Sequence, residues 1–204
     1  MKIIATSDIH MKKVLLNRLS HIDGDLLLIC GDFSNTGSPQ SLDIILSEIS
    51  KLDFKYIVAT MGNHDIDMER DLDKYRTKYP KIKFLDNETC EIECVKIYGS
   101  PYCLEFNNWA FPYVNEIDCR NKTIPKSDVD IVICHEPPYH RDLSFIGDMF
   151  YGNEPLREFL ETNSNSPEVL FCGHIHENGG NSQLINQTLC VNCSQTIIEY
   201  EFEK

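Results

Sequence analysis

Short apolar runs alternate with amphipathic stretches through the first half of the chain, and this pattern predicts alternating strands and helices. The apolar runs have the continuity of strands that are covered on both faces, and they span residues 2–6, 25–30 and 55–60. The amphipathic stretches predict helices over residues 12–21, 38–52 and 68–79. This order is typical of a parallel sheet with helices packed against it.

The helix predicted over residues 38–52 has the clearest start. Ser38 can accept a hydrogen bond as the N-cap, and Pro39 suits the first helical position. Its apolar residues recur every three or four positions and form one stripe: Leu42, Ile45, Leu46, Ile49 and Leu52. The helix after it is expected to end before Pro80, because a proline ring cannot continue a helix.

The second half of the chain is richer in strand patterns. Strands are predicted over residues 81–85, 90–95, 96–100, 128–134, 168–172, 188–194 and 196–202, and a helix over residues 154–161. Residues 100–126 have no clear periodicity but hold many aromatic side chains. We therefore expect a single α/β domain over residues 1–204, with helices outside two sheets.

The charge of the chain limits the classes of partner. A net charge of −13 argues against stable binding to nucleic acid, which requires many basic side chains. The same charge is compatible with a small phosphorylated substrate, because bound metal ions can supply local positive charge. The sequence leaves open whether the protein is a monomer or a dimer.

The cysteines and the apolar runs predict a reducing, cytoplasmic setting without a membrane segment. There are nine cysteines, an odd number, and Cys30, Cys134 and Cys172 lie inside apolar runs where a disulfide is not expected. The first apolar run is too short for a secretion signal, and no run approaches the length of a transmembrane helix.

Residue types that bind metals follow five of the apolar runs. These residues are Asp8, His10, Asp32, Asn63, His64, Asp65, His135, His174 and His176. One such residue after a strand is usually a turn or capping residue. Ligands of α/β sheets, however, bind beyond the carboxyl ends of the strands. Five strand ends that each deliver such a residue therefore predict a shared site along one rim of the sheets.

The donor types indicate which ions the site would take. In an extended backbone, residues i and i+2 point to the same side, so His174 and His176 can face one point. Imidazole, carboxylate and amide donors together suit manganese, iron, cobalt, nickel or zinc rather than calcium. Seven donors are too many for one catalytic ion with an open position, and about right for two ions that share a carboxylate.

The fragments D-x-H, GD, GNH, H and GHxH, in this order between Asp8 and His176, resemble the signature of the calcineurin-like metallophosphoesterase superfamily. The resemblance implies a four-layer αββα sandwich of two mixed β-sheets flanked by helices. It also implies two divalent ions, with manganese first among the candidates. One ion would be held by Asp8, His10, Asp32 and His176, and the other by Asp32, Asn63, His135 and His174.

Other stretches resemble a narrower group, the MPPED-type branch, whose members are phosphodiesterases of cyclic nucleotides or other small substrates. They are GDFSNTG, YGSPY, CHEPP, GHIHENGG and VNCS. The implied reaction is hydrolysis of a phosphoester by a hydroxide that bridges the ions. His64 would contact the phosphate, as would Asn63, or protonate the leaving oxygen. Asp65 would either orient the His64 ring or stabilise the turn.

Several alternatives stay open at this point. Arg141 faces the substrate phosphate or, more in keeping with exposed arginines, forms a surface salt bridge. The aromatic residues Tyr102, Phe106, Trp109, Phe111 and Tyr113 stack on a nucleobase or, as we favour, form a small core beneath a long loop. The activity itself is that of a phosphodiesterase or a phosphomonoesterase, protein phosphatases included. A scaffold without catalysis is the third possibility, although scaffolds usually lose metal ligands.

Overall fold

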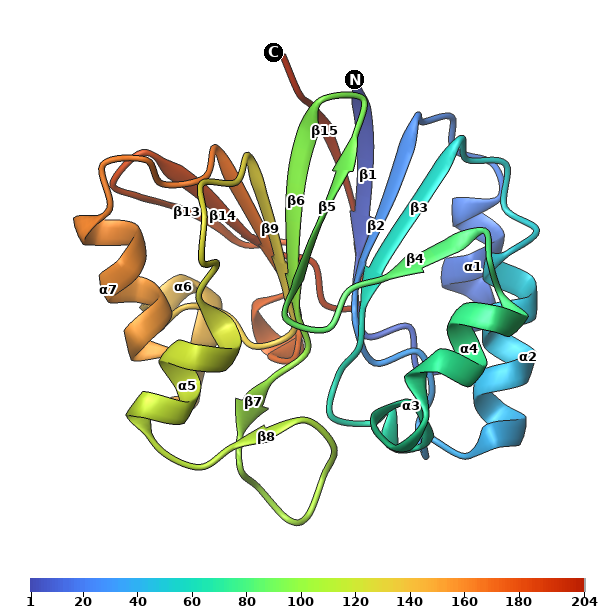
Figure 1. Ribbon diagram of the computed structural model, residues 1–204, viewed down its shortest axis with the longest axis horizontal. Helices are drawn as coiled ribbons and strands as arrows, with labels where there is room; N and C mark the ends of the chain where they lie inside the picture. Colours follow the sequence, from blue (N-terminus) through green and yellow to red (C-terminus); the bar gives the residue numbers. More distant parts are fainter. Residues whose placement is uncertain (204) are drawn as a thin grey trace.

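The computed structural model describes residues 1–203 and consists of two β-sheets packed face to face, with helices on both outer faces (Figure 1). The first sheet has the strand order β15-β1-β2-β3-β4. Its strands are β1 (Lys2–Thr6), β2 (Leu26–Cys30), β3 (Tyr56–Thr60), β4 (Ile82–Phe84) and β15 (Ile197–Glu201). Only β15 runs antiparallel to its neighbour, so the sheet is mixed.

The second sheet has the order β13-β14-β12-β9-β6-β5. Its strands are β5 (Glu88–Ile92), β6 (Val95–Ser100), β9 (Ile131–Cys134), β12 (Val169–Cys172), β13 (Ser182–Ile185) and β14 (Thr188–Asn192). The four inner strands are parallel, and the edge strands β5 and β13 are antiparallel to their neighbours.

Helices cover the outer face of each sheet. Beside the first sheet lie α1 (Lys13–Leu19), α2 (Pro39–Ile49), α3 (Ile66–Arg70) and α4 (Leu72–Lys78). Beside the second sheet lie α5 (Glu116–Thr123), α6 (Arg141–Ser144) and α7 (Glu154–Thr162). A 3-10 turn, η1 (His176–Asn178), follows β12. The predicted four-layer α/β fold is confirmed.

Successive side chains of a strand point to opposite faces of its sheet, so each sheet contributes to a hydrophobic core on both faces. Ile3 and Ala5 of β1 face the second sheet and contact a core that includes Ile131 and Phe171. Ile4 of β1 points the other way, into the core beneath α1 and α2. Each central strand is therefore buried on both faces, which accounts for the continuous apolar runs in the sequence.

Two helical segments differ from the sequence prediction. The helix expected over residues 68–79 is two helices, because Asp71 is extended (φ −153°) and its side chain accepts a hydrogen bond from Lys74 N, starting α4. Helix α5 lies in the segment for which no periodicity was found. Its signal was chemical: an Asn115 N-cap that accepts from Asp118 N, acidic residues in the first turn and basic residues in the last.

The strands that precede the predicted site residues all end at one rim. The N-terminus and the start of β1 lie at the top of Figure 1, so the carboxyl ends of the parallel strands lie below. Two short strand pairs, β7 (Cys103–Leu104) with β8 (Pro112–Tyr113) and β10 (Phe145–Ile146) with β11 (Met149–Phe150), carry loops near this rim. Within residues 1–203, no helix is both long and apolar enough to cross a membrane.

Candidate metal centre

Tight turns after the strands bring the polar side chains inward. Asp8, His10, Asp32 and His174 all have positive φ, between 44° and 68°, which costs a residue other than glycine of the order of 1 kcal/mol or more. Hydrogen bonds between the turns offset this strain, since Asp8 N donates to Gly31 O at 3.0 Å and His10 N to Asp32 O at 3.1 Å. Strained backbone that is held in this way is typical of a functional site.

One group of donor atoms has the spacing of ligands around a single ion. The His176 Nε2 atom lies 3.0 Å from Asp8 Oδ1 and 3.3 Å from His10 Nε2. The His10 Nε2 atom lies 3.5 Å from Asp32 Oδ2 and 3.8 Å from Asp8 Oδ1. Tetrahedral bonds of about 2.0–2.2 Å give ligand separations of about 3.3–3.6 Å. The ligand atoms of Asp8, His10 and His176 lie close enough together to hold a metal ion, and Asp32 adjoins this group through His10.

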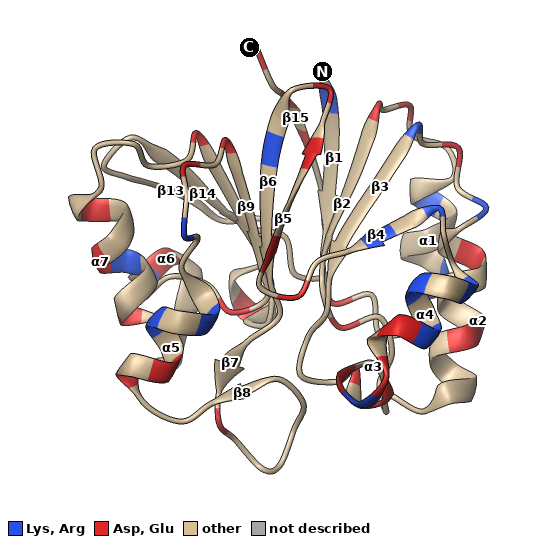
Figure 2. Cartoon of the chain, in the orientation of Figure 1, with Lys and Arg blue, Asp and Glu red and all other residues tan. Residues whose placement is uncertain are grey.

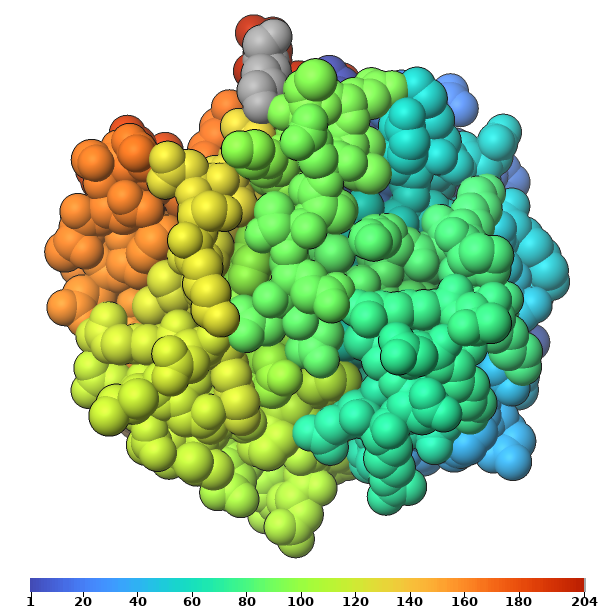
Figure 3. Space-filling model, in the orientation of Figure 1, coloured from blue at the N-terminus to red at the C-terminus, as the bar shows by residue number. Residues whose placement is uncertain are grey.

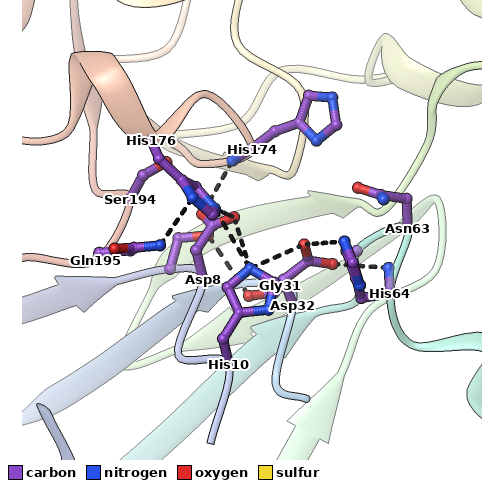
Figure 4. Close-up of polar contacts among 12 residues, drawn as sticks. Asp8, His10, Gly31, Asp32, Asn63, His64, His174, His176, Ser194 and Gln195 are labelled. Carbon is purple, nitrogen blue, oxygen red and sulfur yellow. Dashed lines mark hydrogen bonds and ion pairs between the residues drawn. The ribbon is translucent and has the colours of Figure 1, made fainter. Parts of the chain in front are cut away.

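A second group lies on the other oxygen of Asp32. His135 Nε2 is 3.5 Å from Asp32 Oδ1 and 3.0 Å from Asn63 Oδ1. The same Asp32 oxygen accepts a hydrogen bond from His64 N at 2.9 Å. Asp32 therefore has an imidazole nitrogen near each of its carboxylate oxygens, and Figure 4 shows its contacts with His10 and His64. A ligand that bridges two ions must offer one oxygen to each.

Backbone carbonyls fix the histidine tautomers. His135 Nδ1 lies 2.7 Å from Cys30 O, and His10 Nδ1 lies 3.3 Å from Ser34 O. A carbonyl oxygen only accepts, so each Nδ1 carries a proton and each Nε2 is left to face the centre. Outer contacts of this kind orient imidazole ligands in metal sites.

Two buried carboxylates dominate the charge of the centre. Asp8 and Asp32 are 0% and 2% exposed, and neither forms an ion pair with Lys or Arg in residues 1–203. Burial works against ionisation, but hydrogen bonds from His10 and His176 hold the pKa of Asp8 well below its usual value. Burial likewise opposes the positive charge of His135, yet the Asp32 and Asp8 carboxylates raise the His135 pKa to about 10. Two buried anions beside imidazoles provide the charge that divalent cations would balance.

His174 takes a different position from the other histidines. Its backbone N donates to Asp8 Oδ2 at 2.9 Å, but Figure 4 shows its ring turned away from Asp8. The ring lies beside His135, with centroids 5.0 Å apart, and the possible ligand atoms of His174, His135 and Cys103 all lie within 4.8 Å of one another. Burial, together with the nearby His135, lowers the pKa of His174 to about 4 and keeps its ring neutral. Cys103 was not among the residues selected from the sequence, because no motif pointed to it.

Asp65 contacts backbone groups and not the ring of His64, whose orientation was one of its two predicted roles. The Asp65 carboxylate accepts hydrogen bonds from the backbone N–H groups of Asp32, Phe33 and Gly62, at 2.9–3.1 Å. The His64 ring is held instead by Asn35 O, 2.8 Å from Nδ1. Asp65 thus stabilises the turns that carry the donors, the second of the two roles considered. Burial, reinforced by the charge of Asp32, raises the Asp65 pKa to about 8.

The aromatic segment divides between core and surface. Phe111 and Tyr113 are buried, as the small-core interpretation requires, whereas Phe106 is 67% exposed. Trp109 packs against His64, with ring centroids 4.1 Å apart. The segment is attached to the turn after β3 and to α3, because Ala110 N donates to Asn63 O and Phe111 N to Glu69 Oε1. Figure 3 shows the segment around residues 63–69, in teal, next to the segment around residues 106–111, in yellow-green, at the lower edge.

Arg141 does not form the surface salt bridge that the sequence favoured. It is exposed at the start of α6, and within residues 1–203 no carboxylate pairs with it. Its guanidinium lies 5.7 Å from the centroid of the Phe145 ring, a cation–π contact at the start of the β10–β11 hairpin.

Sequence and structure comparisons agree with this geometry. Residues 1–178 match the family described as calcineurin-like phosphoesterase. The chain is 26% identical to a probable rhamnogalacturonate lyase C of Emericella nidulans, over 98% of this chain and 19% of that protein. It is also 26% identical to the human metallophosphoesterase domain-containing protein 1, over 87% of this chain and 62% of the relative. The chain thus spans less than two thirds of both relatives.

A solved structure shares the fold. It is an archaeal phosphodiesterase, with a TM-score of 0.53 and 16% sequence identity, covering 94% of this chain and 82% of the other. Three observations point to the same family. They are the sandwich of two mixed sheets, the rim of histidines and carboxylates, and the family match over most of the sequence. The chain belongs to the calcineurin-like phosphoesterase family.

Proposed function

We propose that this chain is a single-domain, dinuclear, metal-dependent phosphodiesterase that acts on small substrates. The observation that carries the proposal is the position of Asp32, whose oxygens each lie 3.5 Å from an imidazole Nε2, of His10 on one side and His135 on the other. Divalent ions bound there would neutralise phosphoryl oxygens and acidify a water molecule.

The residues are proposed to act as two ligand sets. Asp8, His10, Asp32 and His176 hold one ion, and Asp32, Asn63, His135 and His174 hold the other. Manganese is the proposed metal, with iron, zinc, cobalt and nickel as alternatives, because the donors mix imidazole nitrogens with carboxylate and amide oxygens. Asn63 is also proposed to contact the substrate, since its amide lines the adjoining pocket.

His64 is the proposed proton donor to the leaving oxygen. Its Nδ1 is fixed by Asn35 O, its ring packs on Trp109, and its Nε2 lies 4.0 Å from Asp32 Oδ2 at the edge of the centre. The side chain is partly exposed, so a substrate bound between the ligand sets can reach it. Arg141 is proposed to meet a substrate phosphate from the neighbouring hairpin.

The pocket beside the centre favours a diester over a monoester. Its walls are uncharged: Asn63, Cys103, Leu104, Phe106, Trp109, Ala110, Pro112 and His174. Figure 2 shows the β7–β8 loop with almost no charged residues. A diester has one negative charge and a second organic substituent that can lie against such uncharged walls, although the enclosed space of about 20 Å³ holds no more than a water molecule. A monoester dianion would gain more from Lys or Arg side chains, and none lines this pocket.

Parallel assays would test the proposal. The metal-free protein is loaded with manganese, its metal content is measured, and bis-p-nitrophenyl phosphate and p-nitrophenyl phosphate are compared. We expect two ions per chain and a higher kcat/KM for the diester. A preference for the monoester would favour the phosphomonoesterase alternative, and bound metal without turnover on either ester would favour the scaffold. A panel of 2′,3′- and 3′,5′-cyclic nucleotides and dinucleotides would then narrow the substrate.

The state of the cysteines supports a reducing, cytoplasmic site of action, which we also propose. All nine are free thiols, and seven are buried in the described chain. An oxidising compartment usually converts such a set in part to disulfides.

A further inference from the structure

The strand pair β7–β8 holds Cys103 at the proposed metal centre. Cys103 begins β7, where its N–H donates to Phe111 O at 3.0 Å. The residue is 3% exposed, and its side chain lines the same pocket as Asn63 and His174. Its Sγ and one ring nitrogen from each of His135 and His174 lie within 4.8 Å of one another.

The thiol is not simply one more buried cysteine of the sheets. Within the described chain, Cys103 is the one cysteine that groups with two histidines in this way. Cys172, by contrast, lies in the second sheet and donates to the Val191 carbonyl. Cys103 itself has only a long contact of 3.6 Å to the Pro101 carbonyl.

The imidazole of His174 has no other fixed partner. Its ring forms no hydrogen bond within residues 1–203, and it packs edge-on against the His135 ring. An imidazole on a pocket wall, close to a thiol and a second imidazole, offers the donor types of a zinc site. Bonds of about 2.3 Å to sulfur and about 2.0–2.1 Å to nitrogen separate such donors by about 3.6 Å, inside the observed limit.

We propose that Cys103 is a further ligand of the ion held by His135 and His174, and that its sulfur makes this position prefer zinc over manganese. Binding replaces the S–H bond by an S–metal bond and releases one proton to solvent, with no change of oxidation state. Thiolates favour zinc, whereas manganese favours oxygen donors. The inference rests on the proposed function, because the same two histidines belong to the proposed second ligand set.

The test uses the full chain, stripped of metal and reloaded with cobalt, whose bond to a thiolate gives a sulfur-to-metal charge-transfer absorption in the near ultraviolet. We expect two cobalt ions per chain and this absorption in the wild type, in Cys90→Ser and not in Cys103→Ser. Cys90 is the control because it is a half-buried thiol on β5, outside the cluster. The ratio of zinc to manganese affinity should also fall about tenfold or more in Cys103→Ser.

The outcomes separate this inference from the proposed function. Two bound cobalt ions without the absorption, or an absorption that survives in Cys103→Ser, would overturn the role of Cys103 and leave the dinuclear enzyme intact. Binding of fewer than two ions by the wild type would overturn both. If Cys103→Ser does not fold, as judged by circular dichroism, Cys103→Ala gives the same comparison with an apolar side chain in the buried position.

Discussion

At the scale of single residues, the centre depends on side chains that point inward from strained turns. Asp8 and Asp32 are buried and form no ion pair with Lys or Arg within residues 1–203, and backbone carbonyls fix the imidazoles of His10 and His135 beside them. Burial of two carboxylates destabilises the metal-free protein, and bound cations offset this cost. Substitutions at these positions should therefore affect metal content before they affect the fold.

Asp32→Asn removes the negative charge that both proposed ligand sets share. We expect the variant to lose metal from both positions and to lose activity by about 100-fold or more. Metal analysis by mass spectrometry and turnover of bis-p-nitrophenyl phosphate measure the two effects. Asp73→Asn is the matched control, because its side chain is 88% exposed and forms one surface pair with Arg76. Full metal content and activity in Asp32→Asn would be incompatible with the two-ion arrangement.

His64→Ala removes the proposed proton donor but none of the proposed ligands. Both ions should stay bound while kcat falls about 100-fold or more on esters with poor leaving groups. The loss should be smaller for p-nitrophenolate, which leaves without protonation. The measurement is kcat across a series of leaving groups, and an equal loss for all of them would show that His64 does not donate the proton.

Asp86 gives a prediction about pH that is independent of the metal centre. Its Oδ1 atom is buried without a hydrogen-bond partner, and burial raises its pKa above the usual value. Between the unfolded and the folded pKa the native state binds more protons, so this carboxyl makes stability fall as pH rises. Asp86→Asn should therefore raise the Tm at pH 7 and flatten this part of the pH profile. An unchanged or lower Tm at pH 7 would contradict this account.

At the scale of elements, the β7–β8 segment connects the centre to its pocket. Glu136, directly after His135, accepts hydrogen bonds from Tyr113 OH at 2.7 Å and from Leu104 N at 3.2 Å. Both donors belong to this strand pair, so a buried carboxylate ties the pocket wall to β9. Sequence patterns identified neither the short pair, whose strands have two residues each, nor α5, whose eight residues carry no apolar stripe.

Tyr113→Phe tests this connection. Without the hydroxyl, Glu136 loses its shortest hydrogen bond in a buried position, which should cost about 1–3 kcal/mol of stability. KM for the diester should rise more than kcat falls, because the pocket wall moves while the proposed ligands stay. Urea unfolding and steady-state kinetics measure these effects, with Tyr151→Phe as the control, since Tyr151 is 43% exposed. A change in kcat alone would argue against a role in placing the wall.

At the scale of the whole molecule, the centre joins the two sheets. Asp8 and Asp32 come from the first sheet, whereas His135 and His174 come from the second. The chain has a net charge of −13, so cations at this junction also reduce repulsion. Metal binding should therefore stabilise the packing of one sheet on the other.

Removal of metal provides the corresponding test. Treatment with EDTA should lower the Tm, and addition of manganese or zinc should restore it. An ion present at about 100 times its Kd adds about 2.7 kcal/mol to the free energy of unfolding. Differential scanning calorimetry of Asp32→Asn is the control, because its Tm should respond much less. Equal responses in wild type and variant would place the stabilising ion elsewhere.

The amino-acid sequence by itself determined the alternation of elements, the buried strands and the rim at which the polar residues gather. These follow from local periodicity and from the rule that parallel strands end together. The contacts of Asp65, the exposure of Phe106 and the position of Cys103 beside two histidines were decided only by the tertiary structure. Each depends on contacts between residues far apart in the chain, which the local pattern of apolar and polar residues does not predict.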